Sequence, residues 1–204
     1  MTLRALTIAR EYGSAGGEIA GIVASRLGWR LVDKDLLTEI GRRAQVSVGD
    51  TIALDERIDP WIHRITRPLW GTGADGMSAI SRVDLFDADA EASVAKLVIE
   101  EAYCQGSCVI VGRGSQCVLQ AKRDAFRVFV YASWDDRVRR VQEHLKPGVN
   151  VNELLRVMDE QRLEYVRRHY KEDRLDPHLY DLMVNSHSQP EAAARLILSA
   201  IAGQ

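Results

Sequence analysis

Short apolar runs alternate along the chain with longer segments in which apolar residues recur at helical spacing. The runs predict five strands, at residues 6–9, 29–33, 108–111, 126–131 and 180–185. The longer segments predict helices at residues 18–27, 35–44, 83–103, 135–145, 151–170 and 190–201. Strands that alternate with helices predict an α/β fold in which helices cover both faces of a parallel sheet.

Two segments between the second and third predicted strands depart from this pattern. Residues 50–65 hold a weaker helical pattern that Pro60 interrupts, and residues 66–81 are rich in Gly and Pro. The second segment is either a disordered connector or a lid over a substrate, and the sequence leaves both readings open.

The segment after the first predicted strand is the candidate binding loop. Residues 10–17 hold three glycines and a serine, and we expect the next helix to begin at Glu18. Glycines let backbone N–H groups close around phosphate oxygens, and a helix N-terminus adds unpaired donors and a positive dipole end. The alternative is a plain strand-to-helix turn. The predicted phosphate-binding residues are Gly13, Ser14, Ala15, Gly16, Gly17 and Glu18.

This loop lacks both the lysine of the full P-loop motif and the hydroxyl residue at its magnesium position. The motif reads G-x-x-x-x-G-K-[ST], in which the lysine contacts the β- and γ-phosphates and the hydroxyl binds magnesium. Aligned through the helix, the lysine position falls on Gly16 or, one register later, on Gly17. The loop therefore predicts phosphate binding, whereas phosphoryl transfer has to rest on other cations.

The composition and net charge of the chain argue against several classes of function. A formal net charge of −2 over 204 residues gives no whole-chain attraction to nucleic acid or to anionic membranes. There is no run of about 18 apolar residues, the length that a membrane span needs. Three irregularly spaced cysteines predict neither a disulfide framework nor a zinc site. Because Met1 leads straight into the first strand without a signal pattern, we expect one cytoplasmic domain over residues 1–204.

Polar residues follow several of the predicted strands. Parallel α/β sheets bind ligands beyond the carboxyl ends of their strands, a rule that gathers residues 10–17, Asp33 and residues 112–113 at one edge. Arg113 stands between two glycines, where a guanidinium can hold a second phosphate through paired donors. The alternative is a surface arginine that caps a turn.

Residues 156–174 form a strongly charged segment between the fourth and fifth predicted strands. Its mixture of arginines and carboxylates fits an exposed helix with i, i+4 ion pairs. Its position also fits the arginine-bearing lid of P-loop kinases, whose guanidinium groups neutralise charge on a transferring phosphoryl group.

In order and spacing, these motifs resemble the cytidylate kinase-like family, relatives of the bacterial cytidylate kinases. The resemblance covers nearly the whole chain. It rests on Arg10-Glu-Tyr-Gly-Ser14 with Gly16, on Asp33-Lys34, on residues 109–114, on Ala132-Ser133 with Arg137 and Arg140, and on Tyr180-Asp181 with Asn185. Relatives with a similar loop often carry arginine where this chain has Gly17.

The resemblance implies a P-loop kinase fold with a five-stranded parallel sheet, an acceptor-binding region at about 34–82 and a helical lid at about 145–175. It also implies ATP and Mg²⁺ as cofactors, with ATP phosphates on residues 13–18. The implied catalytic residues are Arg10, Arg113, Arg162 and Arg174, and Arg137 and Arg140 lie on the ATP side. The implied acceptor residues are Asp33, Lys34, Gly112 and Arg113, and the magnesium candidates are Ser14 and Glu18.

The first hypothesis is therefore a kinase that transfers the γ-phosphoryl group of ATP to a nucleoside monophosphate, specifically a pyrimidine nucleotide. The second is a nucleotide-binding regulatory protein that transfers weakly or not at all, because it lacks the lysine. The third is a kinase for another small acceptor. The expected partners are small nucleotides, without nucleic acid or membrane, and a homodimer is the candidate assembly.

Overall fold

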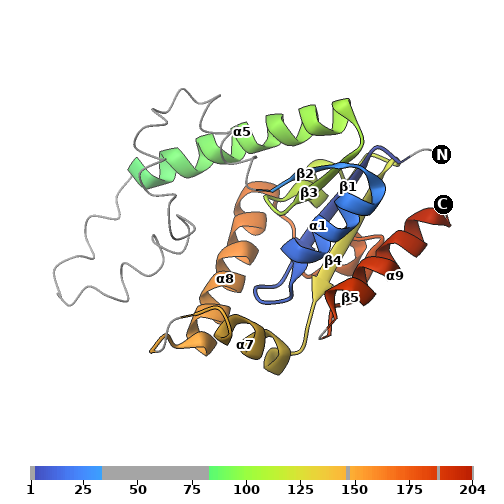
Figure 1. Ribbon diagram of the computed structural model, residues 1–204. Coiled ribbons are helices and arrows are strands. Elements are labelled where there is room, and N and C mark those ends of the chain that lie inside the picture. Colours follow the sequence, from blue (N-terminus) through green and yellow to red (C-terminus); the bar gives the residue numbers. More distant parts are fainter. Residues whose placement is uncertain (1–2, 34–82, 146–147, 188, 204) are drawn as a thin grey trace, which may run out of the picture. The chain divides into compact units, whose positions relative to one another are not determined.

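The computed structural model describes residues 3–33, 83–145, 148–187 and 189–203 (Figure 1). Contacts group the chain into two compact units, residues 1–34 with 96–204 and residues 35–95. In the second unit, only the first part of helix α5 (Val83–Gln105) is described. Lys34, the predicted helix at 35–44, the patterns at 50–65 and 66–81 and most of the acceptor region therefore lie outside the described residues.

Five parallel strands form one sheet in the order β2-β3-β1-β4-β5, which confirms the predicted fold class (Figure 1). The strands are β1 (Ala5–Arg10), β2 (Arg30–Val32), β3 (Cys108–Val111), β4 (Ala125–Tyr131) and β5 (Leu182–Asn185). Cys108 pairs with both Ala5 and Arg30, so the first three strands start level with one another. Their carboxyl ends therefore meet at one edge of the sheet. Arg10, Asp33 and Gly112 lie at this edge, because each stands at the end of its strand or directly after it.

The main core lies between the sheet and two helices, α1 (Gly16–Leu27) and α9 (Pro190–Ala202). Leu6, Ile8 and Val128 on the sheet are fully buried against Ile19 and Ile197 on these helices. Fully burying one such side chain stabilises the fold by about 1.5–3 kcal/mol. On the other face a smaller cluster packs near α6 (Ser115–Val118); it comprises Ala9, Phe129, Leu179 and Tyr180, with Cys117 against it.

Two further helices, α7 (Trp134–Gln142) and α8 (Val151–Tyr170), follow β4 in the chain. Ser133 caps α7 by accepting from the N–H of Asp136, and Asn150 caps α8 by accepting from the N–H of Glu153. Lys171 takes a left-handed conformation that ends α8. The bounds of α8 match the predicted helix at 151–170.

Several predicted boundaries were wrong by one to three residues; α7, for example, ends at Gln142 rather than at 145. Two of these shifts have a clear physical reason. Helix α1 begins at Gly16 rather than Glu18, because Ala15 turns left-handed and starts the helix on two residues of poor helix propensity. Strand β5 begins at Leu182 rather than 180, because the N–H of Tyr180 donates to the carbonyl of Pro177 and closes a short 3₁₀ helix, η1 (Pro177–Leu179). In the described part of the chain, no helix has the length and apolar character of a bilayer span.

Candidate functional site

The loop between β1 and α1 folds into a tight left-handed turn. The hydroxyl and N–H of Ser14 donate to the carbonyl of Glu11 at 2.9 and 3.4 Å, and Gly13 and Ala15 have φ values of 79° and 58°. A Cβ at Gly13 would lie 2.9 Å from Val141 Cγ2, so only glycine fits there. The chain therefore closes into a narrow loop and enters α1 directly.

The N-terminus of α1 carries no side-chain cap. Ala15 makes no capping hydrogen bond, and the N–H of Ile19 donates to the Ala15 carbonyl at 2.9 Å to begin the helical ladder. The N–H groups of Gly16, Gly17 and Glu18 precede that ladder, and such groups have no partner within their own helix. A helix end of this kind, with its positive dipole end, is a site for an anion.

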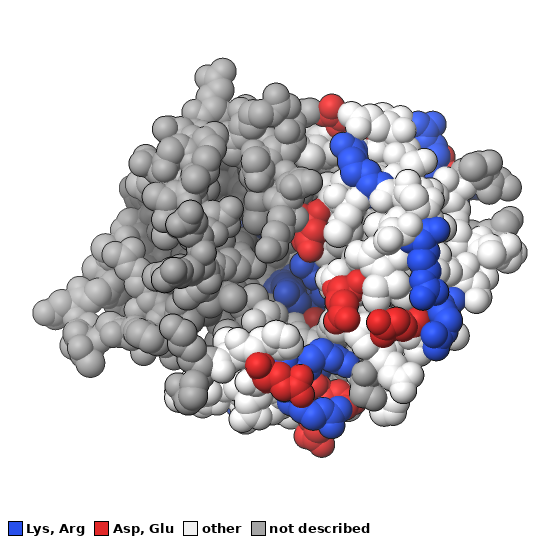
Figure 2. All heavy atoms as spheres, viewed as in Figure 1, with Lys and Arg blue, Asp and Glu red and all other residues white. Residues whose placement is uncertain are grey.

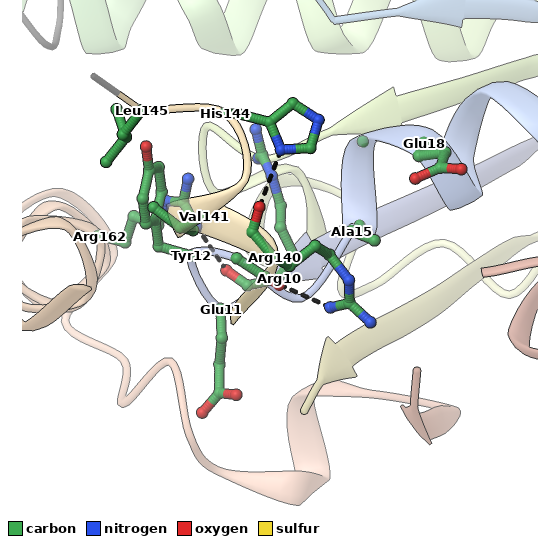
Figure 3. Close-up of a pocket in the computed structure, with 13 residues that line it drawn as sticks. Arg10, Glu11, Tyr12, Ala15, Glu18, Arg140, Val141, His144, Leu145 and Arg162 are labelled. Atoms are coloured by element: carbon green, nitrogen blue, oxygen red, sulfur yellow. Dashed lines mark hydrogen bonds between the residues drawn. The ribbon is translucent and has the colours of Figure 1, made fainter. Parts of the chain in front are cut away.

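A pocket of about 350 Å³ opens at this loop (Figure 3). Side chains reach it from the loop itself, from α7 and the turn that follows α7, and from α8. Its lining residues are Arg10, Glu11, Tyr12, Gly13, Ala15, Gly16, Gly17, Glu18, Arg140, Val141, His144, Leu145 and Arg162.

Arginines from three segments hold the carbonyl groups of the loop. Arg137 Nε donates to the Tyr12 carbonyl at 2.7 Å, and Arg140 Nη1 donates to the Gly13 carbonyl at 2.6 Å. The Arg10 carbonyl accepts from Arg162 at 3.1 Å and also from Arg174. The loop is thus fixed by charged donors from α7, α8 and the segment after α8.

Two carboxylates anchor these arginines. Asp159 on α8 accepts from the Tyr12 N–H at 2.8 Å and pairs with both Arg137 and Arg174. Glu11 pairs with Arg137 at 3.3 Å and accepts from the N–H of Ala132 at 3.1 Å. Asp159 was not among the site residues predicted from the sequence, since the charge pattern of its segment equally fits an exposed helix and Tyr12 is 147 residues away.

Positive charge is concentrated where β1 ends. Burial, together with the nearby charges of Arg10 and Arg174, lowers the pKa of Arg162 to about 9, against the opposing effect of Asp159. Burial also lowers the pKa of Arg174. Three guanidinium groups gathered at one place are a favourable environment for an anion.

The structure brings eight of the sequence-predicted residues together in the pocket lining. These are Arg10, Gly13, Ala15, Gly16, Gly17, Glu18, Arg140 and Arg162. Ser14, Arg137 and Arg174 lie outside the lining; each is at least 96 % buried and bonded to the loop's own backbone. Glu11 and Tyr12 also line the pocket; they lie in the quoted motif at residues 10–14, which gave them no role. Val141, His144 and Leu145 complete the lining, and no motif in the sequence pointed to these three.

The acceptor-side residues follow β2 and β3. Arg113 has a φ of 55° between Gly112 and Gly114, and its guanidinium carbon lies 5.9 Å from the centre of the Tyr165 ring. The Tyr170 hydroxyl donates to the Arg113 carbonyl at 3.2 Å. Asp33 lies 3.9 Å from Arg10. Arg113 is therefore held by two aromatic residues of α8 and does not line the pocket beside the loop.

Phosphate fits this donor set better than a protein-held metal. The described residues contain no group of three or more His, Cys, Asp or Glu side chains that could hold a metal ion. Of the two predicted magnesium residues, Glu18 lines the pocket, whereas the Ser14 hydroxyl is engaged with the loop. Mg²⁺ in kinase sites is commonly held by one or two carboxylates together with substrate phosphates and water, which one carboxylate at this edge would suit.

Solved structures share the fold at low sequence identity. An uncharacterized protein from Eubacterium ventriosum is 19 % identical with a TM-score of 0.68, over 98 % of this chain and 99 % of that chain. A shikimate kinase from Bacteroides thetaiotaomicron is 15 % identical with a TM-score of 0.55, over 98 % of each chain. One from Acinetobacter baumannii, in complex with shikimate, is 14 % identical with a TM-score of 0.52, over 100 % of this chain and 96 % of that chain.

These structures establish the P-loop kinase fold for the chain and, at such identities, nothing finer. No curated protein sequence matches. The model of the cytidylate kinase-like family matches residues 5–188, nearly the whole length over which the sequence motifs were found. Together with the loop, the uncapped helix and the sheet order, this match shows that the chain belongs to the cytidylate kinase-like family.

Proposed function

We propose that the protein is a phosphotransferase that binds ATP at the loop between β1 and α1. The phosphoryl acceptor in this proposal is a nucleoside monophosphate, specifically a pyrimidine nucleotide. The observation that carries the proposal is the uncapped N-terminus of α1, which opens into a pocket lined by Arg10, Arg140 and Arg162. Backbone donors and cations that face one pocket are the groups that phosphoryl transfer needs, because its catalysis consists largely of positioning and charge stabilisation.

Each group has a distinct role in this proposal. The N–H groups at residues 16–18 bind phosphate oxygens, and Glu18 and Asp33 are the carboxylates available to magnesium. When bound there, Mg²⁺ would offset the negative charge of the phosphate groups. Arg162 neutralises charge that develops during transfer, and the loss of one such group commonly costs about 2.7–4 kcal/mol of transition-state stabilisation.

The acceptor phosphate is assigned in this proposal to Arg113. Its position two residues beyond the end of β3 supports the assignment, since β3 is the neighbour of β1 in the sheet. Tyr165 and Tyr170 fix the orientation of this arginine from α8. The preference for a pyrimidine nucleotide rests on the family alone.

Surface charge also supports a small-molecule substrate. On the face shown in Figure 2, basic and acidic side chains of the described residues are interspersed rather than gathered into one broad basic area. A nucleic-acid-binding surface would present a continuous basic stripe.

The test is ADP formation from ATP and Mg²⁺ with CMP, dCMP, UMP, AMP and shikimate offered separately. We expect turnover that depends on CMP or UMP and falls at least about 100-fold in Arg113→Ala. Arg123→Ala is the matched control, because Arg123 is an exposed arginine near the start of β4. If shikimate were the one acceptor of the five that gave turnover, it would take the place of the nucleotide acceptor in the proposal. Unchanged turnover in Arg113→Ala would refute the role of Arg113.

A second candidate function is nucleotide binding without transfer. The observation in its favour is that neither Gly16 nor Gly17 can supply the P-loop cation. Calorimetry that shows tight ATP binding, with no acceptor-dependent turnover for any of the five acceptors, would establish this second function instead.

A further inference from the structure

The side chain of Arg10 occupies the space above two glycines. A Cβ at Gly16 would lie 2.5 Å from Arg10 Cβ and 2.8 Å from Arg10 Cγ, distances that real side chains do not adopt. A Cβ at Gly112 would overlap Arg10 Nη1 and would lie 3.3 Å from Arg10 Cζ. The aliphatic stem of Arg10 therefore passes over Gly16, and its guanidinium ends over Gly112.

This path carries a positive charge from β1 across to the end of β3. The Arg10 side chain is 22 % exposed and lines the pocket, and Asp33 lies 3.9 Å from its guanidinium on the far side of β3. The carbonyl of Arg10 accepts hydrogen bonds from Arg162 and Arg174. These bonds fix the main chain of Arg10, while its side chain extends toward Gly112.

The neighbouring glycine is in a different environment. A Cβ at Gly17 would meet only Asp33 Oδ2, at the ordinary contact distance of 3.8 Å. Gly16 and Gly17 are consecutive residues in the first turn of α1, yet only Gly16 is required to be glycine by the side chain of Arg10. The side chain of Arg10 can therefore follow this path only because residue 16 has no side chain.

We propose that Arg10 replaces the P-loop lysine and contacts the terminal phosphate groups of the bound nucleotide. The cation of the loop comes from the last residue of β1 rather than from the first turn of α1, and Gly16 is glycine to make room for it. This inference rests on the proposed function, because it assumes that the loop binds a nucleoside di- or triphosphate. A guanidinium in this position can bind two phosphate oxygens at once, whereas an ammonium is a point charge.

The experiment measures the affinity of ATP, ADP and AMP, each with Mg²⁺, by calorimetry. The variants are Arg10→Met, which keeps the stem and removes the charge, and Gly16→Ala, whose methyl group displaces the stem. Gly21→Ala is the matched control, because Gly21 lies further along α1, outside the pocket lining, and nothing lies within 4 Å of its added methyl group. A double variant, Arg10→Gly with Gly16→Lys, moves the cation back to the helix; glycine is needed at position 10 because even an alanine Cβ there would lie 2.5 Å from a Cβ at position 16.

We expect Arg10→Met to lower the affinity for ATP and for ADP by about 10- to 100-fold, which is the effect of losing a hydrogen bond to a charged group. The affinity for AMP should stay within about twofold of the wild-type value. Gly16→Ala should reproduce this loss, Gly21→Ala should not, and the double variant should regain at least part of the ATP affinity. Circular dichroism of each variant confirms that it is folded, and the two independent single variants keep the test valid if one fails to fold.

Unchanged ATP affinity in folded Arg10→Met would overturn the inference and leave the proposed function standing. So would equal effects of Gly16→Ala and Gly21→Ala. Wild-type protein that binds none of the three nucleotides would instead overturn the proposed function itself, and the two failures are therefore distinguishable.

Discussion

Asp159 joins α8 to the loop, and its removal tests the whole network. In Asp159→Ala the N–H of Tyr12 loses an acceptor at 2.8 Å, and Arg137 and Arg174 lose an ionic partner. Both arginines are only 4 % exposed, so water cannot readily replace the carboxylate. Breaking a buried ion pair by removing one partner typically costs about 3–5 kcal/mol.

The expected magnitude lies at the low end of that range. The Asp159 side chain is 23 % exposed, and Arg137 keeps its ion pair with Glu11, so we expect the free energy of unfolding to fall by about 3 kcal/mol. Asp159→Asn retains an acceptor for the N–H of Tyr12 and should lose about half as much.

Urea unfolding at pH 7, followed by far-ultraviolet circular dichroism, measures this change. Glu160→Ala is the matched control, because Glu160 is the next residue of α8, also acidic, and exposed; its effect should stay within about 0.5 kcal/mol. A loss below about 1 kcal/mol in Asp159→Ala, or an equal loss in the control, would show that Asp159 does not hold the loop.

Three further predictions concern other parts of the fold. Gly21→Ala in α1 should raise the free energy of unfolding in urea by about 0.5–1 kcal/mol, because nothing lies within 4 Å of the new methyl group and alanine favours the helix. Burial alone would raise the pKa of Asp181, but its hydrogen bonds and ion pair with Arg127 outweigh burial and lower it below the ordinary 3.8. The pair therefore contributes fully at neutral pH and is lost as the pH falls through that lowered pKa, so urea unfolding of wild type and Asp181→Asn should differ at pH 7 and converge in acid; a constant difference would contradict this. Gly114→Ala should lower the unfolding free energy by about 1–3 kcal/mol in the same assay, because φ is 70° and the methyl group would meet the Tyr170 ring; a neutral result would contradict the packing.

Local patterns were enough to predict the elements and the loop. The five strands follow from short apolar runs, and the bounds of α8 follow from helical spacing and from Asn150 as its cap. The three glycines between β1 and α1 located the candidate site, because their conformational freedom is a property of the residues themselves. Family membership, which the motifs in their order indicated, is confirmed.

Contacts between distant residues could not be predicted in this way. Arg174 was expected at a lid, yet it is buried, and its donor reaches the carbonyl of Arg10, 164 residues away. Ser14 was a magnesium candidate, yet its hydroxyl donates to the Glu11 carbonyl inside the turn. A charge pattern specifies that an arginine needs a partner but not which one, since the choice depends on how α7 and α8 pack. The roles of the site residues and the lid therefore stay predictions.

The position of β1 in the sheet has a consequence for synthesis of the chain. β1 lies between β3 and β4, and Ala5 pairs with Cys108 on one side and with Ala125 on the other. Ala125 is made 120 residues after Ala5, which at ribosomal rates takes about 6–24 s. During that interval an apolar strand that is fully buried in the finished protein has no β4 to pair with. Chaperones that shield nascent apolar segments should therefore matter more for this chain than for a protein whose first strands pair as a hairpin.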